Sequence, residues 1–298
     1  MKATVNIKLV MFLANLGKYR HKKKDLRADR LRFERFAASR IIREKCIYKP
    51  ISSNGIEAEL IIPPEHDPNR AILYLHGGGY VMGSPRTHRS LVWRIANQAK
   101  ARAFVIAYRL APENPFPAAL NDAIDSYRWC IEQNRDASKI AVMGDSAGGG
   151  LALALLLKLQ ESDLPLPVCA AVISPWTDLT CSSPSVEVMA AEDPILNREK
   201  LQIGARCYAG ETDLKFPYLS PLFGNFKKLP PLLIQVGTEE MLLDDSRRFA
   251  RRAREAGHPV ELEVWEGMIH VWHYLARYIP EGKQAIERIG QFVSKHSA

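Results

Sequence analysis

The chain has 298 residues, of which 47% are hydrophobic and 25% are charged, and its formal net charge is +8. This balance excludes a long disordered chain, and the length accommodates one large core. The positive charge gathers between Lys18 and Lys45 and between Arg247 and Arg254. No sequence motif typical of nucleic-acid-binding domains accompanies these basic segments. We therefore interpret these segments as solvated helix faces and expect no nucleic-acid partner, with attraction to an anionic lipid surface as the alternative.

The cysteines and the first residues bear on location. The five cysteines are widely spaced without a CxxC pair, which indicates neither a disulfide framework nor a metal site. An apolar run from Leu9 to Leu13 is too short to span a bilayer, and no small-residue cleavage site follows it. We interpret this run as part of an amphipathic helix, with a secretory leader as the alternative. The expectation is a cytoplasmic protein without stable membrane insertion.

Short aliphatic or β-branched runs alternate with helical patterns along the chain, which predicts an α/β fold with a mostly parallel sheet and helices on both faces. The first run, Gly55 to Pro63, alternates and ends in two prolines, which favours an antiparallel edge strand. The other predicted strands are Ala71 to Leu75, Ala103 to Tyr108, Ile140 to Met143, Ala170 to Ile173, Leu232 to Val236 and Val260 to Trp265. We expect a central sheet of about eight strands.

Two regions interrupt the alternation. Residues 1–45 read as helical and charged, and residues near 180–220 break the rhythm of strands. Open α/β sheets place their sites at the carboxyl edge of the strands, so we expect both regions to form a helical cap there. The predicted organisation is an N-terminal part of the cap in residues 1–45 and a catalytic domain in residues 46–298 that carries the cap insertion near 180–220.

The strongest chemical signal is Gly144-Asp145-Ser146-Ala147-Gly148, between a predicted strand and an apolar helical run. A G-x-S-x-G sequence in this context forms a sharp turn that exposes the serine hydroxyl as a nucleophile. Glycines suit that turn because the backbone is strained and space beside the serine is scarce. A glycine-rich structural turn is the alternative interpretation for this motif alone.

A second motif, His76-Gly77-Gly78-Gly79, follows the predicted strand that ends at Leu75. Consecutive glycines let bare backbone N–H groups approach a substrate oxyanion, and HGGG is a known oxyanion-hole motif of lipases and esterases. We expect oxyanion donors at Gly78, Gly79 and Ala147. His76 is expected to orient the loop, with Gly77 and Asp145 as supporting residues of the two motifs.

A serine nucleophile needs a base, which in this fold comes late in the chain. His270 follows the last predicted strand and should lie at the carboxyl edge of the sheet, whereas His258 precedes that strand. His273 is expected to pack. The acid that orients the base should follow the strand that ends at Val236, where four carboxylates crowd together. Spacing favours Glu239 or Glu240, while Asp244 and Asp245 are expected to cap the next helix.

The motifs resemble the hormone-sensitive-lipase-like branch of the α/β-hydrolases, also called family IV bacterial esterases. The segments that carry the resemblance are His76 to Arg89, Tyr108 to Asp122, Gly144 to Ala152, Ser174 to Leu179 and Asp193 to Leu196, together with the acid and histidine loops. They span about two thirds of the chain in order, and the HGGG and GDSAG blocks are highly specific. The acid motif departs from the usual pattern of this family, because Glu240 stands where aspartate is expected.

The resemblance implies a serine carboxylesterase that acts on short- to medium-chain acyl esters, with Ser146 as nucleophile, His270 as base and Glu240 as acid. It implies no cofactor and no metal, and a small-molecule ester as the partner of the site. An amide-directed hydrolase of the arylacetamide deacetylase type and a non-catalytic ligand-binding protein are the alternatives. By resemblance, a homodimer through an edge strand near the carboxyl end is a further expectation, and no feature of this sequence decides it.

Overall fold

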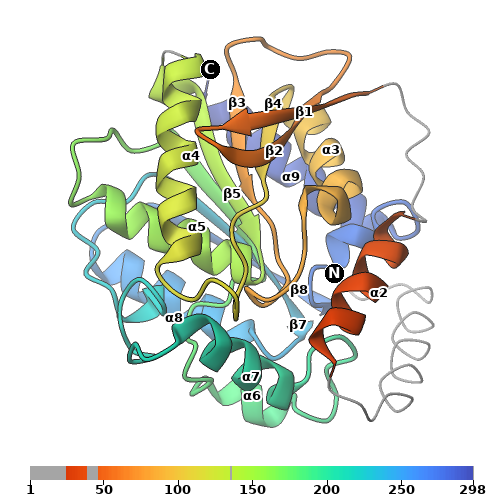
Figure 1. The fold of residues 1–298 in the computed structure, drawn as a ribbon, viewed down its shortest axis with the longest axis vertical. Coiled ribbons are helices and arrows are strands. Elements are labelled where there is room, and N and C mark those ends of the chain that lie inside the picture. Colours follow the sequence, from red (N-terminus) through yellow and green to blue (C-terminus); the bar gives the residue numbers. More distant parts are fainter. Residues whose placement is uncertain (1–24, 39–45, 135, 298) are drawn as a thin grey trace.

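An eight-stranded sheet runs through the computed structural model, which describes residues 25–38, 46–134 and 136–297 (Figure 1). Its order is β1-β2-β4-β3-β5-β6-β7-β8. β2 pairs antiparallel with β1 and β4, and the other neighbours pair parallel. The strands are β1 (Ile47–Ser53), β2 (Ile56–Ile62), β3 (Ala71–Leu75), β4 (Arg102–Ile106), β5 (Ile140–Asp145), β6 (Cys169–Ile173), β7 (Leu232–Glu239) and β8 (Val260–Ile269).

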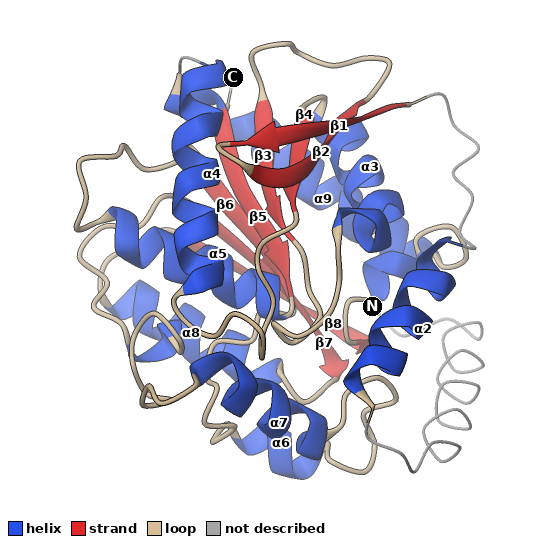
Figure 2. Ribbon diagram, in the orientation of Figure 1, coloured by secondary structure: helices blue, strands red, loops and turns tan. Residues whose placement is uncertain are grey.

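Helices cover both faces of the sheet, as Figure 2 shows. The α-helices among the described residues are α2 (Leu26–Ala38), α3 (Pro85–Ala99), α4 (Ala118–Asn134), α5 (Ala147–Leu159), α6 (Pro184–Val188), α7 (Arg198–Ala209), α8 (Leu243–Glu255) and α9 (Pro280–His296). Three 3₁₀ turns accompany them at Ala137–Lys139, Pro221–Phe223 and Trp272–Leu275. None of the described helices combines the length and the apolar character needed to cross a membrane.

The two faces of the sheet build two cores. Leu73 and Leu75 of β3 pack in one core with residues of α4, α5 and α8. The alternate residues, Ile72 and Tyr74, pack in the other with α3 and α9. A strand buried on both faces is apolar at successive positions rather than at every second one, which explains why β3 reads as a continuous apolar run.

The predicted fold class is confirmed, and two details differ. Gly55 to Pro63 was expected at the edge of the sheet, but β2 lies between β1 and β4. Sequence patterns missed β1 because its side chains are mostly exposed and Pro50 interrupts it. Proline is tolerated there because β1 is an edge strand that pairs only with β2.

The interruption predicted near residues 180–220 is helical, and it contains α6 and α7. Both helices lie with α2 in the lower part of Figure 1. Of the predicted N-terminal cap segment, α2 is described, whereas residues 1–24 and 39–45 lie outside the described residues. The division of the chain into cap and catalytic domain stays a prediction.

Close packing between α3 and α9 gives a test of the fold. A Cβ atom added at Gly290 of α9 would lie 2.7 Å from the backbone carbon of Gln98 in α3. We expect Gly290→Ala to lower the free energy of unfolding by about 1–2 kcal/mol, because overpacking outweighs the better helix propensity of alanine. Chemical denaturation measures this change. The exposed neighbour Gln291→Ala is the control and should be neutral; equal stability of both variants would contradict the packing described.

Candidate active site

Ser146 occupies the sharp turn that joins β5 to α5. Its backbone has φ 54° and ψ −122°, a conformation that non-glycine residues rarely adopt. A Cβ atom at Gly144 would lie 2.3 Å from the carbonyl oxygen of Gly148, and one at Gly148 would lie 2.1 Å from that of Leu75. The two glycines are therefore required by close backbone packing, which holds the serine at the end of the strand.

His270 and Glu240 extend from the ends of two neighbouring strands toward Ser146. The imidazole Nε2 of His270 lies 2.9 Å from Ser146 Oγ, and its Nδ1 lies 2.6 Å from Glu240 Oε2. Glu240 is fully buried, and His270 is only 7% exposed. These three side chains, predicted separately from the sequence, form one continuous chain of hydrogen bonds.

The partners of the imidazole determine its tautomer. Because the Glu240 carboxylate can only accept, Nδ1 of His270 carries a proton and donates it, which leaves the lone pair of Nε2 facing the Ser146 hydroxyl. Burial lowers the pKa of His270, but the charge and the hydrogen bond of Glu240 outweigh burial and leave that pKa above its ordinary value of 6.5.

The other carboxylates of the acid loop, residues 237–245, make no hydrogen bond to His270. Glu239 accepts a hydrogen bond from the Thr238 hydroxyl at 3.1 Å. The expectation that Asp244 and Asp245 cap α8 is wrong, because Leu242 occupies the cap position and no side chain bonds there. Instead, these two aspartates accept hydrogen bonds from the segment after β6.

Asp245 holds that segment by backbone contacts. Its Oδ2 accepts the N–H groups of Thr177 at 2.8 Å and of Asp178 at 2.9 Å, while the Ser183 hydroxyl donates to Oδ1. Asp244 accepts the N–H of Ser185 at 3.0 Å. Burial raises the pKa of Asp245 to about 7, and its donors partly oppose this rise. The acid loop and the insertion that follows β6 are thereby joined.

The glycine loop after β3 lies beside the serine turn. The N–H of Gly77 donates to Asp145 Oδ1 and lies equally close to His88 Nε2, at 3.1 Å in each case. In contrast, the N–H groups of Gly78, Gly79 and Ala147 make no hydrogen bond within the described residues. Gly78 and Gly79 have φ of 125° and 64°, and a Cβ atom at Gly78 would lie 2.1 Å from the Met82 carbonyl oxygen. Glycine is required at Gly78 by both conformation and space.

His76 contacts the glycine loop and is not part of the hydrogen-bonded chain formed by Ser146, His270 and Glu240. Its Nδ1 lies 2.9 Å from the carbonyl oxygen of Gly77, and its ring stacks on Tyr108 at 4.2 Å. The Tyr108 hydroxyl donates to the His76 carbonyl at 2.7 Å. Burial lowers the pKa of His76 to about 3, so the ring is neutral at physiological pH.

Sequence reasoning missed several buried partners of the site. Tyr74 donates its hydroxyl to Asp145 Oδ1 at 2.8 Å, and Asp193 Oδ2 accepts the N–H of Met241 at 2.8 Å. Ser174 donates to Glu240 Oε1 at 2.8 Å. The available signals were weak: a tyrosine in an apolar strand, and two residues within family-like segments to which no role was assigned.

The helices at this end of the sheet also contact the glycine loop. Arg30 of α2 donates from Nε to the Val81 carbonyl at 2.6 Å and from Nη2 to the Ala111 carbonyl at 2.8 Å. On α7, a Cβ atom at Gly204 would lie 3.0 Å from the Gly79 carbonyl oxygen. Two helices distant in sequence thus contact the glycine loop or the residues that follow it.

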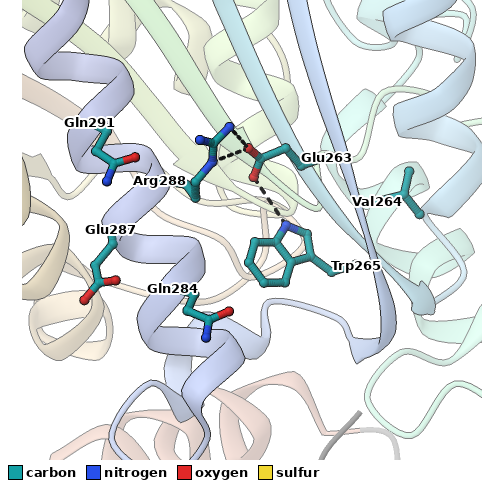
Figure 3. Close-up of a pocket in the computed structure, with 7 residues that line it drawn as sticks. All are labelled: Glu263, Val264, Trp265, Gln284, Glu287, Arg288 and Gln291. Atoms are coloured by element: carbon teal, nitrogen blue, oxygen red, sulfur yellow. Dashed lines mark hydrogen bonds and ion pairs between the residues drawn. The ribbon is translucent and has the colours of Figure 1, made fainter. Parts of the chain in front are cut away.

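A surface pocket elsewhere contains none of these groups. It has a volume of about 420 Å³ and lies between β8 and α9 (Figure 3). Its lining residues are Glu263, Val264, Trp265, Gln284, Glu287, Arg288 and Gln291. Arg288 pairs with Glu263 at 2.8 Å. Among the described residues, no group of three or more histidine, cysteine, aspartate or glutamate side chains could hold a metal ion.

The hydrogen bond from the Tyr74 hydroxyl to Asp145 can be tested by mutation. We expect Tyr74→Phe to lower the free energy of unfolding by about 2 kcal/mol, because a buried carboxylate loses a charge-assisted hydrogen bond. Burial raises the pKa of Asp145, but the adjacent His88 and the Tyr74 hydrogen bond leave that pKa below its ordinary value. Tyr208→Phe is the matched control, since this buried hydroxyl has no partner among the described residues. Equal stability losses would contradict the assignment.

Comparison with known proteins places the chain in a family. A family model described as the alpha/beta hydrolase fold matches residues 72–274. The acetyl-hydrolase of Streptomyces hygroscopicus is 44% identical over 79% of each chain. The ethyl acetate hydrolase of Pseudomonas putida is 34% identical over 81% of this chain and 79% of its own. The crystal structure of an esterase from the bacterial hormone-sensitive lipase family is 40% identical, covers 100% of both chains and has a TM-score of 0.95. The chain therefore belongs to the α/β-hydrolases, in their bacterial hormone-sensitive lipase branch.

Proposed function

We propose that this protein is a serine carboxylesterase that hydrolyses short- to medium-chain acyl esters through an acyl-enzyme. The observation that carries the proposal is the hydrogen-bonded chain from Ser146 through His270 to Glu240 beside three unpaired N–H groups. The relatives named acetyl-hydrolase and ethyl acetate hydrolase support a small acyl group.

Acylation begins with proton transfer. His270 Nε2 takes the Ser146 proton while Oγ attacks the ester carbonyl carbon, so the C–O bond forms and the carbonyl electrons move to oxygen. Glu240 stays ionised and stabilises the imidazolium. The oxyanion accepts hydrogen bonds from the N–H groups of Gly78, Gly79 and Ala147. Ala147 is the first residue of α5, where helix N–H groups are unpaired and the helix dipole favours negative charge.

Collapse of the tetrahedral intermediate breaks the bond to the leaving alkoxide, which takes the proton from His270 and departs as an alcohol. Neutral His270 then removes a proton from water, and the hydroxide attacks the acyl-enzyme. The second intermediate releases the carboxylic acid as the proton returns to Ser146. Apart from the substrate and this water, every step uses groups of the chain, so the proposed mechanism needs neither a metal nor an organic cofactor.

The direct test is hydrolysis of p-nitrophenyl acetate, butyrate, octanoate and palmitate. We expect turnover of the short and medium esters and loss of this activity to background in Ser146→Ala. Glu240→Gln should lower kcat by about a thousandfold or more, because an amide cannot stabilise the imidazolium as a carboxylate does. Glu239→Gln is the matched control, since Glu239 bonds Thr238 instead.

Two outcomes would overturn the proposal. Wild-type protein no more active than Ser146→Ala on any ester would exclude the esterase. Faster hydrolysis of the matched p-nitroanilides than of the esters would assign an amide-directed hydrolase with the same groups.

The pH dependence follows from His270, which must be neutral to act as a base. We expect kcat/KM to fall as the pH drops through the pKa of His270, with a midpoint above 6.5 because Glu240 raises that pKa. Glu240→Gln removes the charge, so its midpoint should move to lower pH, while that of Glu239→Gln should not move. An unchanged midpoint in Glu240→Gln would show that another group titrates.

A further inference from the structure

We infer that Ser174 is a positioning residue, which fixes the carboxylate of Glu240 and the backbone beside His270 through one hydroxyl. The inference rests on the proposed function, because it assigns a role within that mechanism. The role is distinct from catalysis, since Ser174 reaches the reacting atoms only through Glu240 and His270.

Two hydrogen bonds locate the Ser174 hydroxyl between the acid and the base. It donates to Glu240 Oε1 at 2.8 Å and accepts the N–H of Val271, the residue after the base, at 3.3 Å. A hydroxyl can donate only one hydrogen bond, and Ser174 donates it to the Glu240 carboxylate. The side chain is fully buried, so both bonds lie in the protein interior, away from bulk water.

The carboxylate of Glu240 divides its contacts between two sides. Oε2 faces Nδ1 of His270, while Oε1 accepts from Ser174 and from the N–H of Gly237 at 2.7 Å. Glutamate has one more rotatable bond than aspartate, so its carboxylate is oriented less strictly by its own backbone. The two hydrogen bonds to Oε1 therefore restrict rotation of the carboxylate and so fix the direction from which Oε2 approaches the imidazole.

The backbone of Ser174 is shaped for this contact. Its φ is +46°, in the left-handed region that non-glycine residues seldom adopt, and its N–H donates to the Gln235 carbonyl at 2.7 Å. The residue thus continues the pairing of β6 with β7 and then turns sharply at the end of the strand. Such a conformation persists only where its surroundings enforce it, and it is often found at functional sites.

The test compares variants that remove the hydroxyl. We expect Ser174→Ala and Ser174→Gly to lower kcat on p-nitrophenyl acetate by about ten- to hundredfold, the range found for groups that orient metal ligands by similar hydrogen bonds. KM should stay within about threefold, because substrate contacts remain. Glycine adopts the observed φ without strain, so Ser174→Gly keeps the backbone geometry if alanine disturbs folding. Ser126→Ala is the matched control, since this buried hydroxyl has no partner among the described residues.

A second readout separates positioning from a general loss of packing. The Nδ1 proton of His270 should give a low-field proton NMR signal, identified by its absence in Glu240→Gln. This signal should shift or broaden in both Ser174 variants and stay unchanged in Ser126→Ala. An unchanged signal, or kcat within twofold of wild type, would overturn the role of Ser174. Absence of Ser146-dependent hydrolysis in the wild type would instead overturn the proposed function, and the NMR signal would still report the contact.

Discussion

The turn at Ser146 is the constraint on which the rest of the site depends. A strand must end, reverse its backbone at a positive φ and begin a buried helix within a single residue. The reversal leaves so little room that Gly144 and Gly148 touch neighbouring backbone. The glycine loop can then lie directly against the turn. The energetic cost of the strained residue is of order 1–3 kcal/mol, which the large surrounding core can sustain.

Buried carboxylates connect the loops around this turn. Asp145, Glu240, Asp193 and Asp245 are almost fully buried, and each accepts hydrogen bonds from backbone N–H groups or hydroxyls. A carboxyl group buried from water is tolerated only where such donors surround it. Because the donors come from different loops, each carboxylate also fixes one loop relative to another. The same hydrogen bonds that stabilise these carboxyl groups thereby align Glu240, His270 and the glycine loop.

The sequence predicted those parts of the fold and site that depend on local pattern. The serine turn and the glycine loop were recognisable because their backbone geometry demands particular residues at adjacent positions. The position of Glu240 beside His270 was harder to predict, since the choice among four nearby carboxylates depends on the length and direction of a turn. The contacts of Tyr74 and Ser174 could not be predicted, because they join strands and loops far apart in sequence. β1 was missed because an exposed edge strand carries no apolar alternation.

The distance along the chain between Ser146 and His270 has a consequence for biosynthesis. The two residues are 124 positions apart, and His270 follows the last strand of the sheet. At about 5–20 residues per second, a ribosome needs on the order of ten seconds to proceed from one to the other. During that interval the nascent polypeptide contains Ser146 but not yet His270, the base of the proposed mechanism. Under the proposed mechanism, Ser146 therefore stays inactive until the final strand and His270 have been synthesised.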